Sequence, residues 1–442
     1  MTSRVARVAL AMGVALVLLV AGALGPLRSR PSDGSEPRAR VGAGVLLAPA
    51  AGDLDGAIGA LQQGLRADPK DARSLATLGL AYIQKARISA DPSFYPKARR
   101  VLRRSLENQP EDNFEAMIGL GALDLALHDF QGALEWAGRA KEFNPQNAQV
   151  RGILGDAYLE LGRYRAADRE FQSMIDLRPD LSSYARVSYA RELRGDTTGA
   201  IKAMRLARSA AGSASDEAWA SYQLGELFFN SGTYGRAGAF YREGARLDST
   251  SVLPEVGLAR VEAATGDIDG AVRRLRPVTR RQPFGEYLTL LGDLLEVAGR
   301  STEAKEQFAL ASANTDLYRT NGVKVDLEEA LFDADNGRPR RALSAARAEY
   351  DRRRSVHVAD ALGWALYANG EFAAADRYAR EALRLGTRNA LFHFHAGMIA
   401  VELDRTDDAI EHLAAALEIN PHFSFRHGPV ATRVLENLRA SR

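Results

Sequence analysis

The sequence predicts an all-α protein, a right-handed superhelical solenoid of ten or eleven helix-turn-helix units. The main observation is an alanine that recurs every 33 to 41 residues along most of the chain. It stands at Ala57, Ala98, Ala133, Ala167, Ala200, Ala237, Ala271, Ala304, Ala342, Ala375 and Ala409. A helical pattern with a period near 34 residues is typical of stacked pairs of antiparallel helices.

The repeating unit is clearest around Gly162. Leu154 and Tyr158 are four residues apart, so they share one face of a first helix, and Ala167 and Phe171 do the same on a second. A glycine between the helices can adopt the left-handed conformation that ends a helix. We therefore expect two antiparallel helices per unit, with the alanine at their close approach and the large residue between neighbouring units.

This unit resembles the tetratricopeptide repeat, whose signature combines Leu-Gly, an aromatic residue, alanine and proline at fixed offsets. Leu-Gly pairs begin at Leu78, Leu120, Leu154, Leu224, Leu291 and Leu362. Turn glycines recur as Gly52, Gly162, Gly195, Gly232, Gly266, Gly299, Gly337 and Gly370. Boundary prolines stand at Pro69, Pro110, Pro145, Pro179, Pro283 and Pro421. The resemblance covers residues 52–421 and implies a protein-binding function.

The first 27 residues have a separate role. Arg4 and Arg7 precede residues 8–27, a run of twenty residues without a charge, which is long enough to span a bilayer. A cleaved secretory signal remains the alternative, because Ala21 and Ala23 fit a small-x-small cleavage pattern. The length of the run favours an uncleaved transmembrane anchor.

Membrane sidedness stays open at this stage. Arginines just after the anchor favour a cytoplasmic array by the positive-inside rule, but long domains translocate largely regardless of flanking charge. We expect an extracytoplasmic array, tethered by a flexible linker over residues 28–50, which contain Pro31, Pro37 and Pro49. A secreted or periplasmic protein is the alternative.

The array is expected over residues 51–421, with three insertions and a cap. The longer alanine gaps place the insertions near residues 86–96, 212–217 and 319–322, where we expect loops. Residues 422–442 contain a short amphipathic stretch with Val430, Val434, Leu435 and Leu438 on one side. This stretch predicts a C-terminal capping helix, because the last unit has no successor to cover its core.

Composition narrows the function classes. The net charge is +2, and residues 1–50 alone carry +4, so the array carries −2 and lacks the basic excess of a nucleic-acid-binding domain. The chain has no cysteine, which excludes disulfides, thiolate catalysis and cysteine metal sites. Its 51 arginines against 7 lysines indicate a GC-rich bacterial gene.

No catalytic motif was found, and the array leaves almost no sequence for a catalytic domain. We therefore predict that the protein is not an enzyme and binds no cofactor. Five of the seven histidines lie in the last 50 residues, at His393, His395, His412, His422 and His427. His393 and His395 point about 200° apart on a helix, so packed or solvated histidines are favoured over a metal site.

A protein partner is expected in the concave groove that first helices line in tetratricopeptide proteins. Mapping the family's groove offsets gives Tyr189, Trp219, Tyr222, Glu226 and Phe229 in one stretch, and Asp360, Trp364, Tyr367, Phe394 and Met398 in another. Aromatic residues dominate many interfaces, although packing between helices is an equal alternative for each. The sequence predicts a non-catalytic interaction scaffold of the bacterial envelope, or a cleaved assembly factor, or, third, a metal-binding accessory protein or enzyme.

Overall fold

The computed structural model describes residues 54–441. This part of the chain forms twenty-two helices and no strands, so the all-α prediction is confirmed. The predicted anchor or signal (1–27) and linker (28–50) lie outside the described residues. Among the helices from α3 to α24, none combines the length and the apolar character that a membrane span requires.

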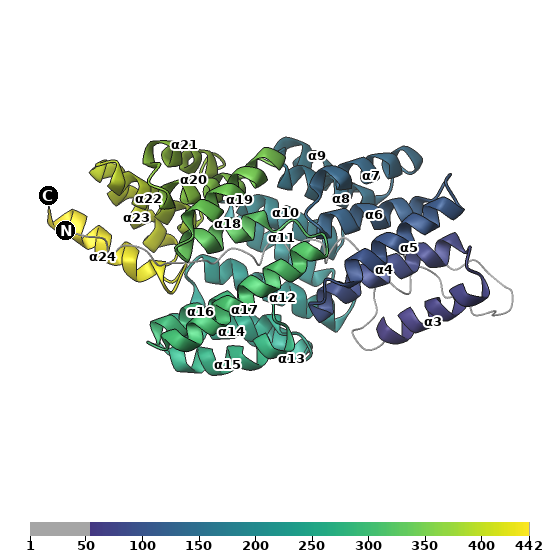
Figure 1. Ribbon diagram of the computed structural model, residues 1–442, viewed down its shortest axis with the longest axis horizontal. Coiled ribbons are helices and arrows are strands. Elements are labelled where there is room, and N and C mark those ends of the chain that lie inside the picture. The colour runs from purple at the N-terminus through teal and green to yellow at the C-terminus, as the bar shows by residue number, and fades with distance from the viewer. Residues whose placement is uncertain (1–53, 442) are drawn as a thin grey trace.

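Ten consecutive helix pairs follow α3 (Leu54–Ala67). Figure 1 shows how they stack on one another. The first helices of the pairs are α4 (Ala72–Ser89), α6 (Phe114–Ala126), α8 (Ala148–Glu160), α10 (Leu181–Glu192), α12 (Ala214–Asn230), α14 (Leu253–Ala264), α16 (Gly285–Val297), α18 (Asp326–Asp335), α20 (Val356–Ala368) and α22 (Ala390–Glu402). The second helices are α5 (Phe94–Asn108), α7 (Phe130–Phe143), α9 (Tyr164–Leu177), α11 (Thr197–Ser209), α13 (Tyr234–Leu247), α15 (Ile268–Arg281), α17 (Ser301–Thr320), α19 (Pro339–Arg352), α21 (Phe372–Ala382) and α23 (Thr406–Ile419).

First and second helices differ in how they are buried. In α6, the ten residues from Ala116 to Leu125 are all buried, so this helix is covered on every side. In α9, only Tyr164, Ala167, Phe171 and Met174 are buried, at spacings of three and four residues. The first helices therefore form the inside of the stack, and the second helices present one apolar face to them.

The repeated alanine marks the close approach of two helices, as predicted. Ten of the eleven alanines, from Ala98 to Ala409, are 0% exposed. The residue four positions later fills the space beside the Leu-Gly glycine: a Cβ added to Gly155 would stand 2.3 Å from the ring of Phe171, and one added to Gly225 would stand 2.3 Å from the ring of Tyr241. A larger residue has no room at these positions.

The bend between the helices of a pair uses the left-handed conformation. Seven of the predicted turn glycines have φ between 71° and 98°, and Gly52 lies outside the described residues. His128 and Asp404 hold the same place in pairs without a glycine, with φ of 57° and 54°. The recurring glycine thus marks the left-handed conformation of the bend, which other residues also adopt at some cost in free energy.

The prediction that the three insertions are loops is only partly right: residues 90–93, 212–213 and 321–322 lie outside the helices, and the other inserted residues are helical. Three helices are longer than their neighbours: α4 has 18 residues, α12 has 17 and α17 has 20. Each long helix consequently extends beyond its shorter neighbours of about 13 residues.

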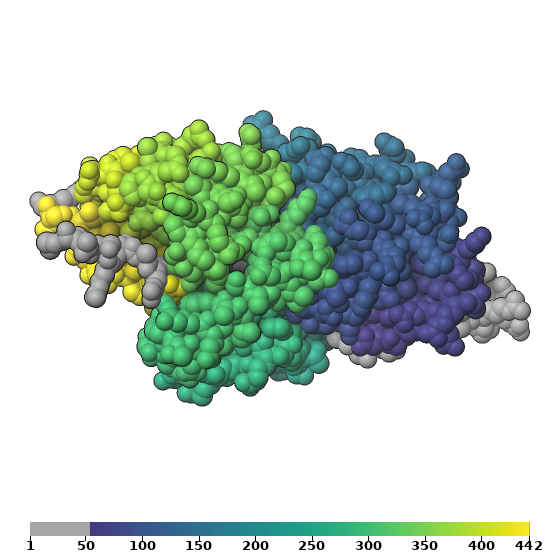
Figure 2. Space-filling view, in the orientation of Figure 1, coloured from purple at the N-terminus to yellow at the C-terminus, as the bar shows by residue number. Residues whose placement is uncertain are grey.

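The stack coils so tightly that it touches itself. Backbone and side-chain hydrogen bonds join residues 191 to 196 positions apart, so one superhelical turn takes between five and six helix pairs. Figure 1 shows α18, α19 and α20 lying beside α6, α8 and α10, and Figure 2 shows the green and blue segments in direct contact. We call this contact between the two superhelical turns the seam.

The seam repeats the same polar contact along its length. The bend of an early pair offers a carbonyl, and a loop between two later pairs supplies the donor. Lys324 donates its backbone N–H to the Leu127 carbonyl at 3.0 Å, and Asn420 donates its side-chain amide to the Phe229 carbonyl at 2.9 Å. Thr387 likewise donates to the Leu193 carbonyl. These donors satisfy backbone groups that the seam would otherwise bury unpaired.

The predicted C-terminal cap is present as α24 (His427–Ala440). Leu435 is buried, and Val430, Val434 and Leu438 pack against the apolar cluster that includes Leu413 of α23. The helix covers the end of the last pair, as a solenoid requires. Arg426 at its start also pairs with Asp293 of α16, 3.0 Å away, so the cap is tied to a helix 133 positions earlier in the chain.

Candidate functional site

The residues that the sequence assigned to a concave groove lie largely inside the molecule. Eight of the ten are 0 to 8% exposed: Tyr189, Tyr222, Glu226, Phe229, Asp360, Trp364, Phe394 and Met398. Trp219 and Tyr367 are half-buried. The buried ones are covered mainly by side chains of their own and neighbouring helix pairs. Their role in partner binding stays a prediction.

The first predicted stretch forms a polar core around Glu226. Tyr241 donates its hydroxyl to the Glu226 carboxylate at 2.5 Å, and Arg260 pairs with the same carboxylate at 2.6 Å. The Arg260 guanidinium lies over the ring of Phe229, 4.0 Å from its centroid, and the Tyr222 ring packs against the Tyr241 ring. Tyr189 and Trp219 belong to neighbouring clusters, so this stretch is brought together only in part.

The second predicted stretch forms one aromatic cluster. Trp364 stacks on Tyr367 at 4.6 Å and on His395 at 4.1 Å, and its ring also contacts Phe394. The Trp364 indole N–H donates to Asp335 Oδ1 at 2.7 Å. The three rings of this predicted stretch therefore lie together, packed between helices.

Two of the five C-terminal histidines, His395 and His427, contact the Trp364 ring of this cluster. His395 Nδ1 lies 2.9 Å from Asp360 Oδ1, and His393 Nδ1 lies 3.2 Å from His412 Nδ1. Within residues 54–441, no group of three or more His, Asp or Glu side chains has the arrangement that could hold a metal ion. Burial lowers the pKa of His393 to about 4 and that of His427 well below its usual value.

Most charged side chains inside the stack are paired with an opposite charge. Arg186 binds Asp156 through two hydrogen bonds of 2.7 and 2.8 Å, with both side chains less than 5% exposed. Arg353 bonds to Glu160 at 2.6 Å across the seam and also to Glu349 of its own helix. Pairing offsets the desolvation of these charges, although a buried pair alone adds little stability.

One cavity lies on the seam, and the charged side chains that line it do not follow this pattern of ion pairing. Its volume is about 150 Å³, and its walls come from the C-terminal ends of α4 and α6 and the start of α5 on one side, and from α16, α17 and α18 on the other. The walls are mainly apolar, with Leu125, Phe284, Tyr318, Leu331 and Phe332 among them.

Three charged side chains line the same cavity: Arg87 of α4, Glu286 of α16 and Glu328 of α18. Burial is the main cause that raises the pKa of Glu286 to about 7, with smaller contributions from the charges of Glu226 and Glu328. Burial also lowers the pKa of Arg87. The cavity therefore combines an apolar interior with poorly solvated charges.

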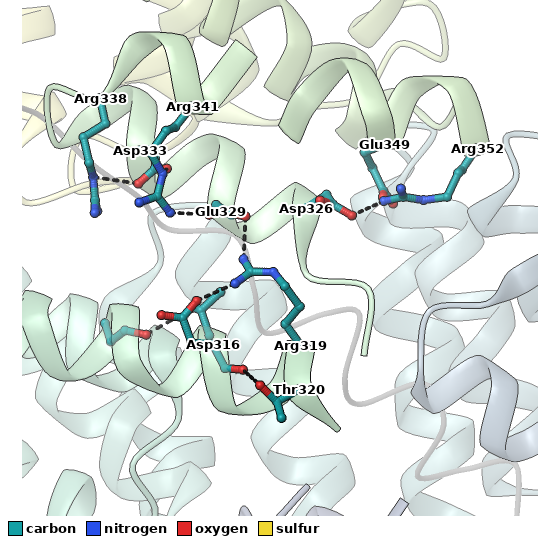
Figure 3. Close-up of polar contacts among 12 residues, drawn as sticks. Asp316, Arg319, Thr320, Asp326, Glu329, Asp333, Arg338, Arg341, Glu349 and Arg352 are labelled. Atoms are coloured by element: carbon teal, nitrogen blue, oxygen red, sulfur yellow. Dashed lines mark hydrogen bonds and ion pairs between the residues drawn. The ribbon is translucent and has the colours of Figure 1, made fainter. Parts of the chain in front are cut away.

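A network of exposed ion pairs fixes the outer side of this cavity wall (Figure 3). Arg319 at the end of α17 bonds to Glu329 of α18 at 2.6 Å, and Glu329 also accepts from Arg341 of α19 at 2.5 Å. Glu328 is the immediate neighbour of Glu329 and lines the cavity. The network thus holds α17, α18 and α19 together where α18 presents Glu328 inward. Pairs of this kind are individually weak, so their value lies in positioning.

The outer surface carries one aliphatic stripe on α17. Leu310 and Leu317 are 53% and 48% exposed, and Ala313 between them is also exposed. These residues are three, four and seven positions apart, so they share one face of the helix. The sequence analysis did not predict this stripe, whose last residue, Leu317, lies on the part of α17 that extends beyond the usual 14 residues of a second helix.

Sequence comparisons identify part of the array. Residues 256–316 and 361–422 match one family model described as tetratricopeptide repeat, and residues 148–181 match another with the same description. The chain therefore contains tetratricopeptide repeats. No curated protein matches it significantly.

Two solved structures are similar at low sequence identity. The Cut9–Hcn1 hetero-tetramer of APC/C is 13% identical over 87% of this chain and 93% of the other chain, with a TM-score of 0.40. PilW, described as a widely conserved type IV pilus biogenesis factor, is 15% identical over 48% of this chain and 98% of its own, with a TM-score of 0.39. Neither likeness bears on function.

Proposed function

We propose that the protein is a non-catalytic scaffold of the bacterial cell envelope that binds a partner protein on the outside of its helical stack. The described chain consists of repeat pairs and a cap, and tetratricopeptide repeats suggest protein-protein interaction. The observation that carries the proposal is the exposed aliphatic stripe of Leu310, Ala313 and Leu317 on α17. Exposing several aliphatic side chains on one helix face to water is unfavourable, so such a face favours a contact site for a partner.

The tight superhelix explains why the outer surface is favoured over the groove. A partner that reached Tyr222 or Phe394 would have to open the stack, because these rings are 0% and 1% exposed. The α17 stripe needs no such opening. Trp219 and Tyr367 are the two predicted groove residues with enough exposure to contact a partner directly.

Attachment to the envelope is supported by residues 8–27, the uncharged run that is long enough to span a bilayer. Under this proposal the full-length protein stays with the membrane after washing with carbonate. The cleaved assembly factor would instead be recovered in the soluble fraction, shortened behind Ala23.

The partner surface is tested by capture of proteins from detergent-solubilised membranes with the full-length chain. The double variant Leu310→Ser, Leu317→Ser is expected to lose at least ten-fold of the partner that wild type captures. Leu206→Ser on α11 is the matched control, because Leu206 is 51% exposed and lies away from the stripe. Unchanged capture by the double variant, with loss in Trp219→Ala or Tyr367→Ala, would place the contact at the predicted groove instead.

A further inference from the structure

The cavity on the seam has the size and lining of a small-molecule site. A volume of about 150 Å³ equals that of an engineered apolar protein cavity that binds benzene. Phe284, Tyr318, Leu331 and Phe332 supply apolar walls for the body of a ligand. Ligand pockets typically pair such walls with a few polar groups that fix orientation.

The charged groups of the cavity lack partners among the described residues. Arg87, Glu286 and Glu328 form no ion pair or hydrogen bond within residues 54–441, unlike the other pairs inside the stack. The Arg87 Nε and one carboxylate oxygen of Glu328 are shielded from solvent and still make no hydrogen bond. Leaving such groups unpaired costs free energy, which a ligand of complementary charge would recover.

The arrangement of these charges selects the ligand class. The single cation, Arg87, comes from the first superhelical turn, and both carboxylates come from the second. A simple amine would leave Arg87 unpaired, and a simple carboxylate would leave Glu286 and Glu328 unpaired. A molecule that carries both charges and a compact apolar group pairs with both sides.

We propose that this cavity binds an apolar α-amino acid in its zwitterionic form. The ligand carboxylate faces the Arg87 guanidinium, and the ammonium group faces Glu286 and Glu328. Its aliphatic or aromatic side chain lies against Phe284, Tyr318 and Phe332. Because the two ends of the ligand contact different superhelical turns, binding joins the turns and stabilises the seam.

Isothermal titration of the full-length chain with matched probes tests the ligand class. The probes are L-leucine, L-phenylalanine, 3-methylbutylamine, which lacks the carboxylate of leucine, and 4-methylpentanoate, which lacks the ammonium group. We expect at least one of the amino acids to bind ten-fold or more tightly than both single-charge analogues. Binding of the amine or the acid with equal affinity, or no binding of either amino acid at millimolar concentration, would overturn the proposal.

Two variants test the placement of the ligand. Arg87→Met and Glu286→Gln should each weaken binding of the amino acid at least ten-fold, whereas Arg104→Met, an exposed change on α5, should leave it unchanged. Both variants remove a charge without a partner, so the ligand-free melting temperature should stay equal or rise. Wild-type affinity in either variant contradicts the proposed contacts, and Glu286→Gln remains decisive if Arg87→Met fails to fold, because glutamine keeps the shape of the side chain.

Discussion

The interface between neighbouring helix pairs and the seam between superhelical turns hold the same stack together by different means. Neighbouring pairs meet through small and large apolar residues, such as Ala167 at 0% exposure and Phe171 beside Gly155. At the seam, the two superhelical turns contact each other through backbone carbonyls, polar side chains and buried charges, such as Arg353 with Glu160. One interface depends on close packing, and the other on pairing of polar groups.

The bend glycines show how the two interfaces differ in their demands. At Gly162, in the first superhelical turn, a Cβ would stand 2.3 Å from the Arg354 carbonyl oxygen, so the seam leaves no room for it. At Gly299 and Gly370, in the second turn, nothing lies within 4 Å of the same position. All three have positive φ, which favours glycine at the bend, and a close approach adds a second demand for glycine only at Gly162.

The largest effect is expected from Arg353→Leu, which breaks the seam. The change leaves Glu160 buried without its cation, and removal of one partner of a buried pair typically costs 3–5 kcal/mol. The free energy of unfolding from urea titration measures the loss. Arg340→Leu, an exposed change on the same helix, serves as the control and should alter stability by less than about 0.5 kcal/mol. Equal stability of the two variants would mean that the seam does not form in solution.

An intermediate effect is expected from Ala167→Leu, which overfills the interface between neighbouring pairs. Ala167 is 0% exposed, and extra methylene groups in a packed contact typically cost 1–3 kcal/mol. Arg169→Leu on the exposed face of α9 is the control and should have little effect. If Ala167→Leu and Arg169→Leu unfold at the same denaturant concentration, the assignment of the alanine to the close approach is wrong.

The smallest effect concerns pH and Glu192, which lies at the end of α10 where both interfaces meet. Burial raises the pKa of Glu192 to about 7 in the folded protein, against a hydrogen bond from Asn230 that lowers it. Because the folded-state pKa is raised, the stabilising contribution is present below about pH 4.5 and is lost as the pH rises through 7.

We therefore expect wild type to lose about 1 kcal/mol more stability than Glu192→Gln between pH 6 and pH 8. Urea titrations at the two pH values compare the variants. Parallel pH profiles for wild type and Glu192→Gln would show that the carboxyl of Glu192 titrates in its ordinary range.

The repeat register could be predicted because it depends on residues close in sequence. Ala, Leu-Gly and the bend glycine recur at fixed offsets, and the structure confirms the burial of Ala98 to Ala409 and the positive φ of seven glycines. The cap was predictable for the same reason, since its apolar spacing lies within one helix. The insertions were predicted only in part, because a length difference alone does not tell a loop from a longer helix.

The seam and the cavity could not be predicted in this way. They depend on the pitch of the superhelix, which accumulates from small angles between successive pairs and brings together residues about 190 positions apart. Burial of Tyr222, Trp364 and Phe394 has a more local cause, because these rings pack against rings of neighbouring helices. The polar loop residues Thr387 and Asn420 were a possible signal, but without the pitch their acceptors on α10 and α12 could not be named.

The seam also changes how the array is expected to unfold. In an open solenoid each repeat touches only the two next to it, so the ends can fray one unit at a time. Here a pair such as α8–α9 has a third neighbour from the following superhelical turn, through Tyr164 and Val356. Unfolding of such a pair therefore breaks its contacts with the adjacent pairs and also its contacts with the following superhelical turn. Removal of the last pairs would consequently weaken the middle of the chain as well as its end.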